Sequence, residues 1–115
     1  MFDFKLDVYQ KAKQFNKEAY TFLKNSKSID SVSRNQLRRA SLSIMLNIAE
    51  GSSRFSKADR RNFFVISRGS VFECVAVFDF LKDESILAEE MYIHFYRQAY
   101  ELSRMLFAMI RNLQT

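Results

Sequence analysis

Apolar residues recur at steps of three and four along most of the chain, the spacing typical of α-helices with one buried face. The first such stretch covers residues 4–24, and its apolar face holds Phe4, Val8, Ala12, Phe15, Ala19 and Phe22. The polar stretch 25–28 interrupts the pattern, so we expect a loop there.

A second helix is predicted over residues 31–50, with Asp30 or Ser31 as its N-cap and Gly51 as a left-handed C-cap. Its apolar residues form two neighbouring stripes, which are Leu37, Ala40, Ile44 and Ile48, and then Leu42, Met45, Leu46 and Ala49. Together the stripes cover about two thirds of the helix, whereas a surface helix of a monomer needs an apolar arc of only about 100°.

The third predicted helix spans residues 57–82, and Ser56 with Asp59 resembles a capping box at its start. It is apolar on almost every side, so we expect it to be buried on every side. Gly69 sits in its middle, where glycine costs about 1 kcal/mol relative to alanine, and close approach of another helix would compensate. A fourth helix is predicted over residues 88–113.

Four long helices joined by short polar links predict an all-α, up-down-up-down four-helix bundle that forms one domain over residues 1–115. The composition agrees, because the chain has no proline and only two glycines and therefore few sharp turns. This excludes sandwiches, barrels, Rossmann domains and P-loop enzymes. Since the second and third helices carry more apolar surface than one bundle buries, we expect a homo-oligomer, or else a groove for a partner helix.

Enzyme chemistry is poorly represented in the sequence. Cys74 is the one cysteine and His94 the one histidine, so we expect no metal site, no cofactor and no catalytic residues, although the residues alone leave a Cys74–His94 dyad open. The lone thiol fits a reducing compartment. The N-terminus lacks a signal-peptide layout, and the longest uncharged run, residues 40–49, is too short to span a membrane. We therefore expect a cytoplasmic protein with no membrane contact.

The formal net charge is +5 and the sequence pI is about 9.5, which favours polyanionic partners. Basic residues form one row on the first helix, a cluster before and within the start of the third, and one row on the fourth. The candidate nucleic-acid-binding residues are Lys13, Lys17, Lys24, Arg54, Lys57, Arg60, Arg61, Arg97, Arg104 and Arg111. The alternative is an ordinary solvated face. The five tyrosines could stack on unpaired bases, and core packing explains them equally well.

The second helix carries a strip of polar residues, and the third helix also offers polar residues. The residues concerned are Arg39, Asn47, Glu50, Arg68, Ser70 and Glu73. If the two helices touch, these side chains need hydrogen-bonding partners, and they form either a ligand-binding pocket or a network that fixes helix register or subunit orientation.

These same segments carry a family resemblance. Residues 38–51 read RRASLSIMLNIAEG, and residues 66–73 read ISRGSVFE. Together with Arg54 and Ser56 they resemble the motifs of the four-helix-bundle proteins encoded in 23S rRNA intervening sequences, a family often labelled ribosomal protein S23. One departure is Met45, which stands where the family commonly carries proline.

The resemblance implies a four-helix bundle that assembles as a ring-like pentamer. The family is also similar to the accessory variability protein of diversity-generating retroelements, which is a basic pentamer that binds nucleic acid and a reverse transcriptase. From the net charge, the basic cluster and this resemblance, we expect a non-enzymatic oligomeric module that binds RNA or DNA. The alternative is a protein–protein interaction scaffold with no nucleic-acid role.

Overall fold

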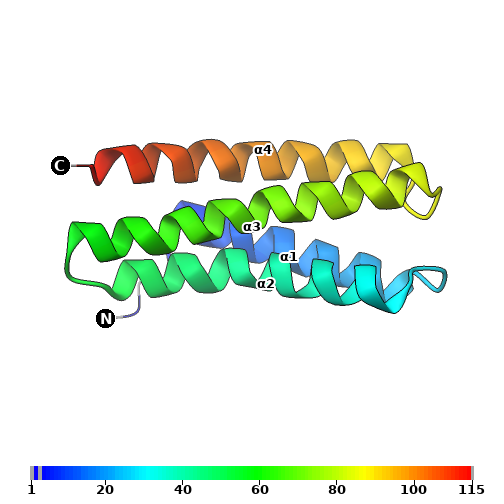
Figure 1. Cartoon of the computed structure of the whole chain (residues 1–115), viewed down its shortest axis with the longest axis horizontal. Helices are drawn as coiled ribbons and strands as arrows, with labels where there is room; N and C mark the ends of the chain where they lie inside the picture. Colours follow the sequence, from blue (N-terminus) through cyan, green and yellow to red (C-terminus); the bar gives the residue numbers. More distant parts are fainter. Residues whose placement is uncertain (1, 3, 115) are drawn as a thin grey trace.

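The computed structural model describes residue 2 and residues 4–114 of the 115-residue chain, and over these residues it confirms the all-α four-helix bundle (Figure 1). The helices are α1 (Asp7–Asn25), α2 (Ser31–Ser53), α3 (Lys57–Asp83) and α4 (Glu89–Asn112). Each predicted helix thus has its counterpart, although α1 starts later than residue 4 and α2 runs past residue 50.

Each helix packs antiparallel to its neighbours in the sequence, and α1 closes the bundle against α4. Figure 1 shows α4, α3 and α2 side by side, with α1 behind them. The α2–α3 turn and both chain ends lie at one end of the bundle, and the α1–α2 and α3–α4 turns lie at the other. No helix in the described part of the chain is long and apolar enough to cross a membrane.

Aromatic rings fill the centre of the core. The rings of Phe78 and Phe95 stack with centroids 4.2 Å apart, which joins α3 to α4. Phe15 of α1 meets both rings edge-on, at 6.1 Å and 6.0 Å. All three side chains are buried, and aromatic pairs of this kind add about 0.5–1.5 kcal/mol each beyond the burial of their area.

Side chains fix where three of the helices begin or end. The Asp30 carboxylate accepts a hydrogen bond from the Ser33 amide at 2.9 Å, and Ser56 Oγ accepts one from the Asp59 amide at 3.1 Å, so both predicted N-caps are present. At the C-terminal end of α1, the Arg34 guanidinium donates to the carbonyls of Leu23 at 2.6 Å and Ser26 at 2.7 Å. Arg34 therefore ties α2 to the last turn of α1.

The two glycines have different roles from those the sequence suggests. Gly51 is not a left-handed C-cap, because α2 continues through it to Ser53 and no described glycine has a positive φ. A Cβ at Gly51 would lie 2.7 Å from Cε1 of Phe64, so α3 packs against Gly51 too closely for a side chain there. A Cβ at Gly69 would meet no atom of the chain within 4 Å, so no helix of this chain approaches there.

The expectation that α3 is buried on every side is wrong for the single chain. Val65, Ile66, Phe72 and Phe80 are all at least 42% exposed, because α3 has neighbours on only two sides. On α2 the first apolar stripe is buried, whereas Leu46 of the second stripe is 52% exposed. The α2 helix runs unbroken through Met45.

Candidate functional site

A cluster of cations occupies the end of the bundle where α2 turns into α3. Arg54 follows the last residue of α2, and Lys57, Arg60 and Arg61 lie in the first two turns of α3. The Ser56 cap starts α3 at Lys57 and so places these side chains together. We call Arg54, Lys57, Arg60 and Arg61 the basic turn; Figure 1 shows its position at the end that also holds the C-terminus.

Most of the basic turn is not neutralised by the protein. Arg54 forms an ion pair with Glu50 at 3.4 Å, and its guanidinium lies 4.6 Å from the Phe63 ring centre. Lys57, Arg60 and Arg61 have no ion pair among the residues that the structure describes. The buried Nε atoms of Arg60 and Arg61 also lack a hydrogen-bond acceptor there. A buried donor without an acceptor costs about 1–3 kcal/mol.

From the basic turn a groove runs between α3 and α4. This lower groove has a volume of about 560 Å³. It is lined by residues of both helices and of the chain end, none of them acidic: Arg61, Val65, Arg68, Gly69, Phe72, Phe107, Ile110, Arg111 and Gln114. Three arginines and no carboxylate give the lower groove a positive field.

Arg68 is held in place inside the lower groove. Its Nε donates to the Ser103 carbonyl of α4 at 3.2 Å. Its guanidinium carbon lies 5.0 Å from the centre of the Phe72 ring and 5.4 Å from that of the Phe107 ring. On the α4 side, the guanidinium of Arg111 lies 5.9 Å from the Phe107 ring centre. The lower groove therefore combines fixed cations with aromatic faces.

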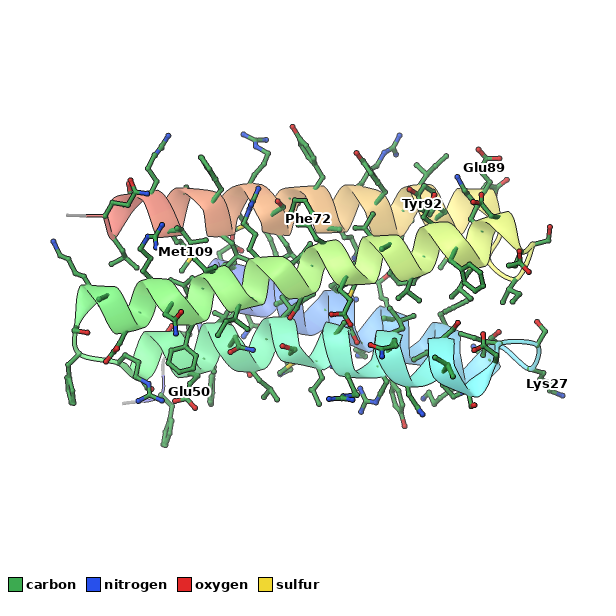
Figure 2. The ribbon with its side chains drawn as sticks, viewed as in Figure 1. Lys27, Glu50, Phe72, Glu89, Tyr92 and Met109 are labelled. Atoms are coloured by element: carbon green, nitrogen blue, oxygen red, sulfur yellow. The ribbon has the colours of Figure 1, made fainter. Side chains whose placement is uncertain are left out.

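A second groove adjoins the lower groove at Phe72 and extends between α3 and α4 toward the α3–α4 turn. Its lining contains more aromatic side chains and fewer charged ones. This upper groove, of about 380 Å³, includes Phe72, Tyr92, Tyr96, Tyr100 and Asp79 in its lining. Figure 2 shows Phe72 and Tyr92 on the side of the molecule where α3 and α4 lie next to each other. Sequence periodicity marks Tyr92, Tyr96 and Tyr100 as one face of α4, but it does not reveal that this face is open.

The predicted basic rows remain on separate helices. Lys13, Lys17 and Lys24 are exposed on α1, and Arg97 and Arg104 are exposed on α4. Only the final member of the α4 row, Arg111, lines the lower groove with Arg61. The sequence analysis missed Arg38 of α2, whose guanidinium lies 4.3 Å from the Tyr20 ring centre. The Nζ atom of Lys24 lies 4.9 Å from the centre of that ring.

The predicted polar network is only partly assembled. Asn47 donates to Ser43 Oγ at 2.9 Å, and Ser70 donates to the same oxygen at 2.9 Å, so a short chain of hydrogen bonds links α2 to α3. Glu50 pairs with Arg54 instead, and Arg68 turns away to α4. Arg39 and Glu73 are exposed, and within the described residues they have no hydrogen bond or ion pair. The link is of the kind that fixes helix register.

The histidine and the cysteine lie apart from this region. His94 Nε2 donates to Glu18 at 2.7 Å, across the contact between α1 and α4. Burial of Glu18 acts to raise its pKa, but hydrogen bonds from His94, Gln98 and Gln14 outweigh it and hold the pKa below its ordinary value. Cys74 is buried, which strongly raises the pKa of its thiol. A protonated, enclosed thiol is a poor nucleophile.

Comparison with known proteins identifies the family. The sequence model of the 23S rRNA-intervening sequence protein family matches residues 4–108. The chain belongs to this family. A solved structure from Bacteroides thetaiotaomicron, described as a protein of unknown function from the S23 ribosomal protein family, superposes with a TM-score of 0.83. It is 24% identical and covers 90% of this chain and 97% of its own. A search of curated proteins gave no match.

The family match explains where the motif residues lie. The RRASLSIMLNIAEG segment forms most of α2, and the ISRGSVFE segment forms the facing turns of α3. Two contacts show what these segments do: the buried Ser67 hydroxyl donates to the Ile44 carbonyl at 2.8 Å, and Gly51 admits the Phe64 ring. For this 23S rRNA-intervening sequence protein, much of the motif therefore serves α2–α3 packing.

Proposed function

We propose that this chain is a binding module, without catalytic activity of its own, that holds RNA or DNA through the basic turn and the adjoining lower groove. The observation that carries the proposal is the gathering of unpaired cations at one end. Lys57, Arg60, Arg61 and Arg111 come from two helices and have no ion pair among the described residues.

Phosphodiester backbones are the chemistry that such a surface fits. Each lysine or arginine that contacts a phosphate releases condensed counterions, which favours binding at low salt. Arginine adds a planar fork of donors that matches two phosphate oxygens.

A pair of charge-reversal variants tests the location. Arg60→Glu with Arg61→Glu should weaken binding of a labelled RNA hairpin at least tenfold at low salt, because two phosphate contacts become repulsive. The matched control is Lys24→Glu with Lys27→Glu, which makes the same change of charge at the opposite end of the bundle, where Figure 2 labels Lys27. Fluorescence anisotropy measures both affinities.

The control should lose much less affinity than the basic-turn variant. Equal losses in the two variants would contradict a site at the basic turn, because they would mean that binding depends only on total charge. Circular dichroism of each variant confirms that the helices are intact before affinities are compared.

We further propose that the module works as a homo-oligomer, with a pentamer favoured by the family resemblance. What supports this is the exposed apolar surface of α2 and α3, which includes Leu46, Ile66 and Phe80. Multi-angle light scattering should give a molar mass several times that of one chain. A stable monomer at micromolar concentration would contradict it.

The same surface favours a second candidate, a protein–protein interaction scaffold with no nucleic-acid role. Failure of every RNA and DNA probe to bind at low salt, together with a stable oligomer, would favour the scaffold. For either function we propose a cytoplasmic location, which a buried free thiol fits because reducing compartments preserve it.

A further inference from the structure

Four aromatic rings along the α3–α4 grooves remain about half exposed. The exposed fractions are 57% for Phe72, 48% for Tyr96, 58% for Tyr100 and 51% for Phe107. Together they line the lower and upper grooves, which share Phe72. Soluble proteins rarely leave so many large rings open on one face unless the face binds something.

The rings on α4 follow one another along one face of the helix. Tyr96 and Tyr100 are four residues apart, which is about 6 Å along a helix axis, and Phe107 follows about 10 Å further on. Tyr92 precedes Tyr96 by the same four residues, and the centres of these two rings are 6.0 Å apart. Aromatic rings repeated along a groove are the platforms on which successive unpaired bases stack.

Arginines accompany the rings. The guanidinium of Arg104 lies 5.9 Å from the Tyr100 ring centre, and that of Arg111 lies 5.9 Å from the Phe107 ring centre. Arg68 sits by both Phe72 and Phe107, and its bond to the Ser103 carbonyl fixes its position. A strand whose bases stack on the rings would therefore have cations within reach of its phosphates.

The charged residues that line the two grooves indicate which kind of ligand they bind. Among the described residues, the lower groove is lined by three arginines and no acidic side chain, so it fits an anion. The upper groove has no cation in its lining and contributes aromatic faces, and its one charged residue is Asp79, which forms an ion pair with Lys82 at 3.5 Å. An apolar helix would leave the arginines of the lower groove without anionic partners. A duplex keeps its base faces stacked inside and cannot present them to Phe107 or Tyr100. An unpaired nucleotide strand can stack its bases on the rings and pair its phosphates with the arginines.

We infer that the groove between α3 and α4 binds unpaired nucleotides, with Phe107 and Tyr100 stacking on bases while Arg61, Arg68 and Arg111 hold phosphates. The inference rests on the proposed nucleic-acid function and deepens it, because it assigns the ligand class as single-stranded rather than duplex. The strand enters at the basic turn and runs along α4.

The test compares a labelled uridine strand of about 12 nucleotides with a duplex of equal length. The wild-type protein should bind the strand more tightly. Phe107→Leu, which keeps apolar bulk but removes the ring, should weaken strand binding about tenfold and leave duplex binding nearly unchanged. Phe107→Trp should retain strand binding. Tyr100→Leu provides an independent second variant, and Tyr20→Leu, an exposed ring on α1 outside both grooves, serves as the control.

The outcomes distinguish a failure of the groove inference from a failure of the proposed nucleic-acid function. If Phe107→Leu and Tyr100→Leu bind the strand like the wild type while the Arg60/Arg61 reversal still weakens binding, the groove inference fails and the basic turn stands. If neither probe binds at low salt, both fail. If Phe107→Leu lowers the molar mass in light scattering without changing strand affinity, the groove holds another copy of the chain, which also overturns the inference.

Discussion

The Phe64 ring of α3 packs directly against Gly51 of α2. The Phe64 ring is almost fully buried, and its Cδ1 and Cε1 atoms occupy the space where a side chain at position 51 would begin. Phe63 Cβ also lies only 3.1 Å from that point. Because a buried ring fills that space, the chain cannot accommodate even one methyl group at position 51 without displacing the Phe64 side chain.

Gly51→Ala should destabilise the fold by about 1–3 kcal/mol, the usual range for overpacking a core. Gly69→Ala is the matched control, since its methyl group meets no atom of the chain and alanine is about 1 kcal/mol better than glycine inside a helix. Urea denaturation should therefore move the two midpoints in opposite directions. Equal shifts would contradict the packing assigned to Gly51.

Arg34 stabilises the chain by a different kind of contact. Its two hydrogen bonds satisfy carbonyls at the end of α1 that have no partner within the helix. Arg34→Ala should lower the free energy of unfolding by about 1.5–3 kcal/mol, the range for hydrogen bonds to charged groups. Arg34→Lys should recover part of the loss, and Arg39→Ala, at an exposed position on the same helix, should change little. Thermal denaturation measures all three.

The sequence could predict interactions between residues close in the chain, such as helix caps. It could not predict which residues of other helices pack against Gly51, Gly69 or Arg34. The helix caps at Asp30 and Ser56 follow from local sequence, because a cap bonds to an amide three residues away. The roles of Gly51 and Gly69 depend on which helix crosses at that level. Local sequence does not show which helices cross, so the predicted C-cap at Gly51 was wrong, and no helix of this chain makes the close approach expected at Gly69.

At the scale of elements, the contact between α1 and α4 is polar at its edge. Glu18 accepts hydrogen bonds from Gln14 of its own helix and from His94 and Gln98 of α4. Lys11 pairs with Glu101 at 3.0 Å nearby, and the hydrogen bond that Lys11 donates to Glu101 raises the pKa of Lys11. The ionised form of Glu18 is thus part of what holds α1 against α4.

The lowered pKa of Glu18 predicts how stability changes with pH. The unfolded chain binds a proton at Glu18 at a higher pH than the folded chain does, so this contribution is present above about pH 5 and is lost as pH falls through the folded pKa. Glu18→Gln should therefore show a weaker loss of stability between about pH 5 and pH 3 than the wild type.

Urea denaturation across this range measures the effect. Glu89→Gln is the control, because Glu89 points away from the bundle at the end of α4 in Figure 2 and is exposed. A pH dependence of Glu18→Gln that equals that of the wild type would contradict the assigned role of the carboxylate.

The helices themselves were predictable, and their exposed faces were not. The three- and four-residue spacing of apolar positions identifies all four helices, since each buries one stripe. On α3 and α4 that spacing also includes Phe72, Tyr100 and Phe107, which the single chain leaves half exposed. Periodicity reports which residues share a face, and it cannot distinguish a core from a binding groove.

At the scale of the whole molecule, charge and aromatic surface are distributed unevenly. The basic turn lies at one end, and the rings extend from it along α3 and α4. Sequence reasoning located the basic turn, because its residues are adjacent in the chain. It placed Arg68 in a network with α2, and only the fold shows that Arg68 faces α4 beside Arg111.

The measurement that tests the central proposal most directly is the affinity of the wild-type protein for a single-stranded RNA across a range of salt concentrations. If about four cations of the basic turn and lower groove contact phosphates, the logarithm of the association constant should fall with the logarithm of salt concentration with a slope of about −3. A flat plot, or no binding at the lowest salt, would contradict the proposal that this 23S rRNA-intervening sequence protein binds nucleic acid through its basic end.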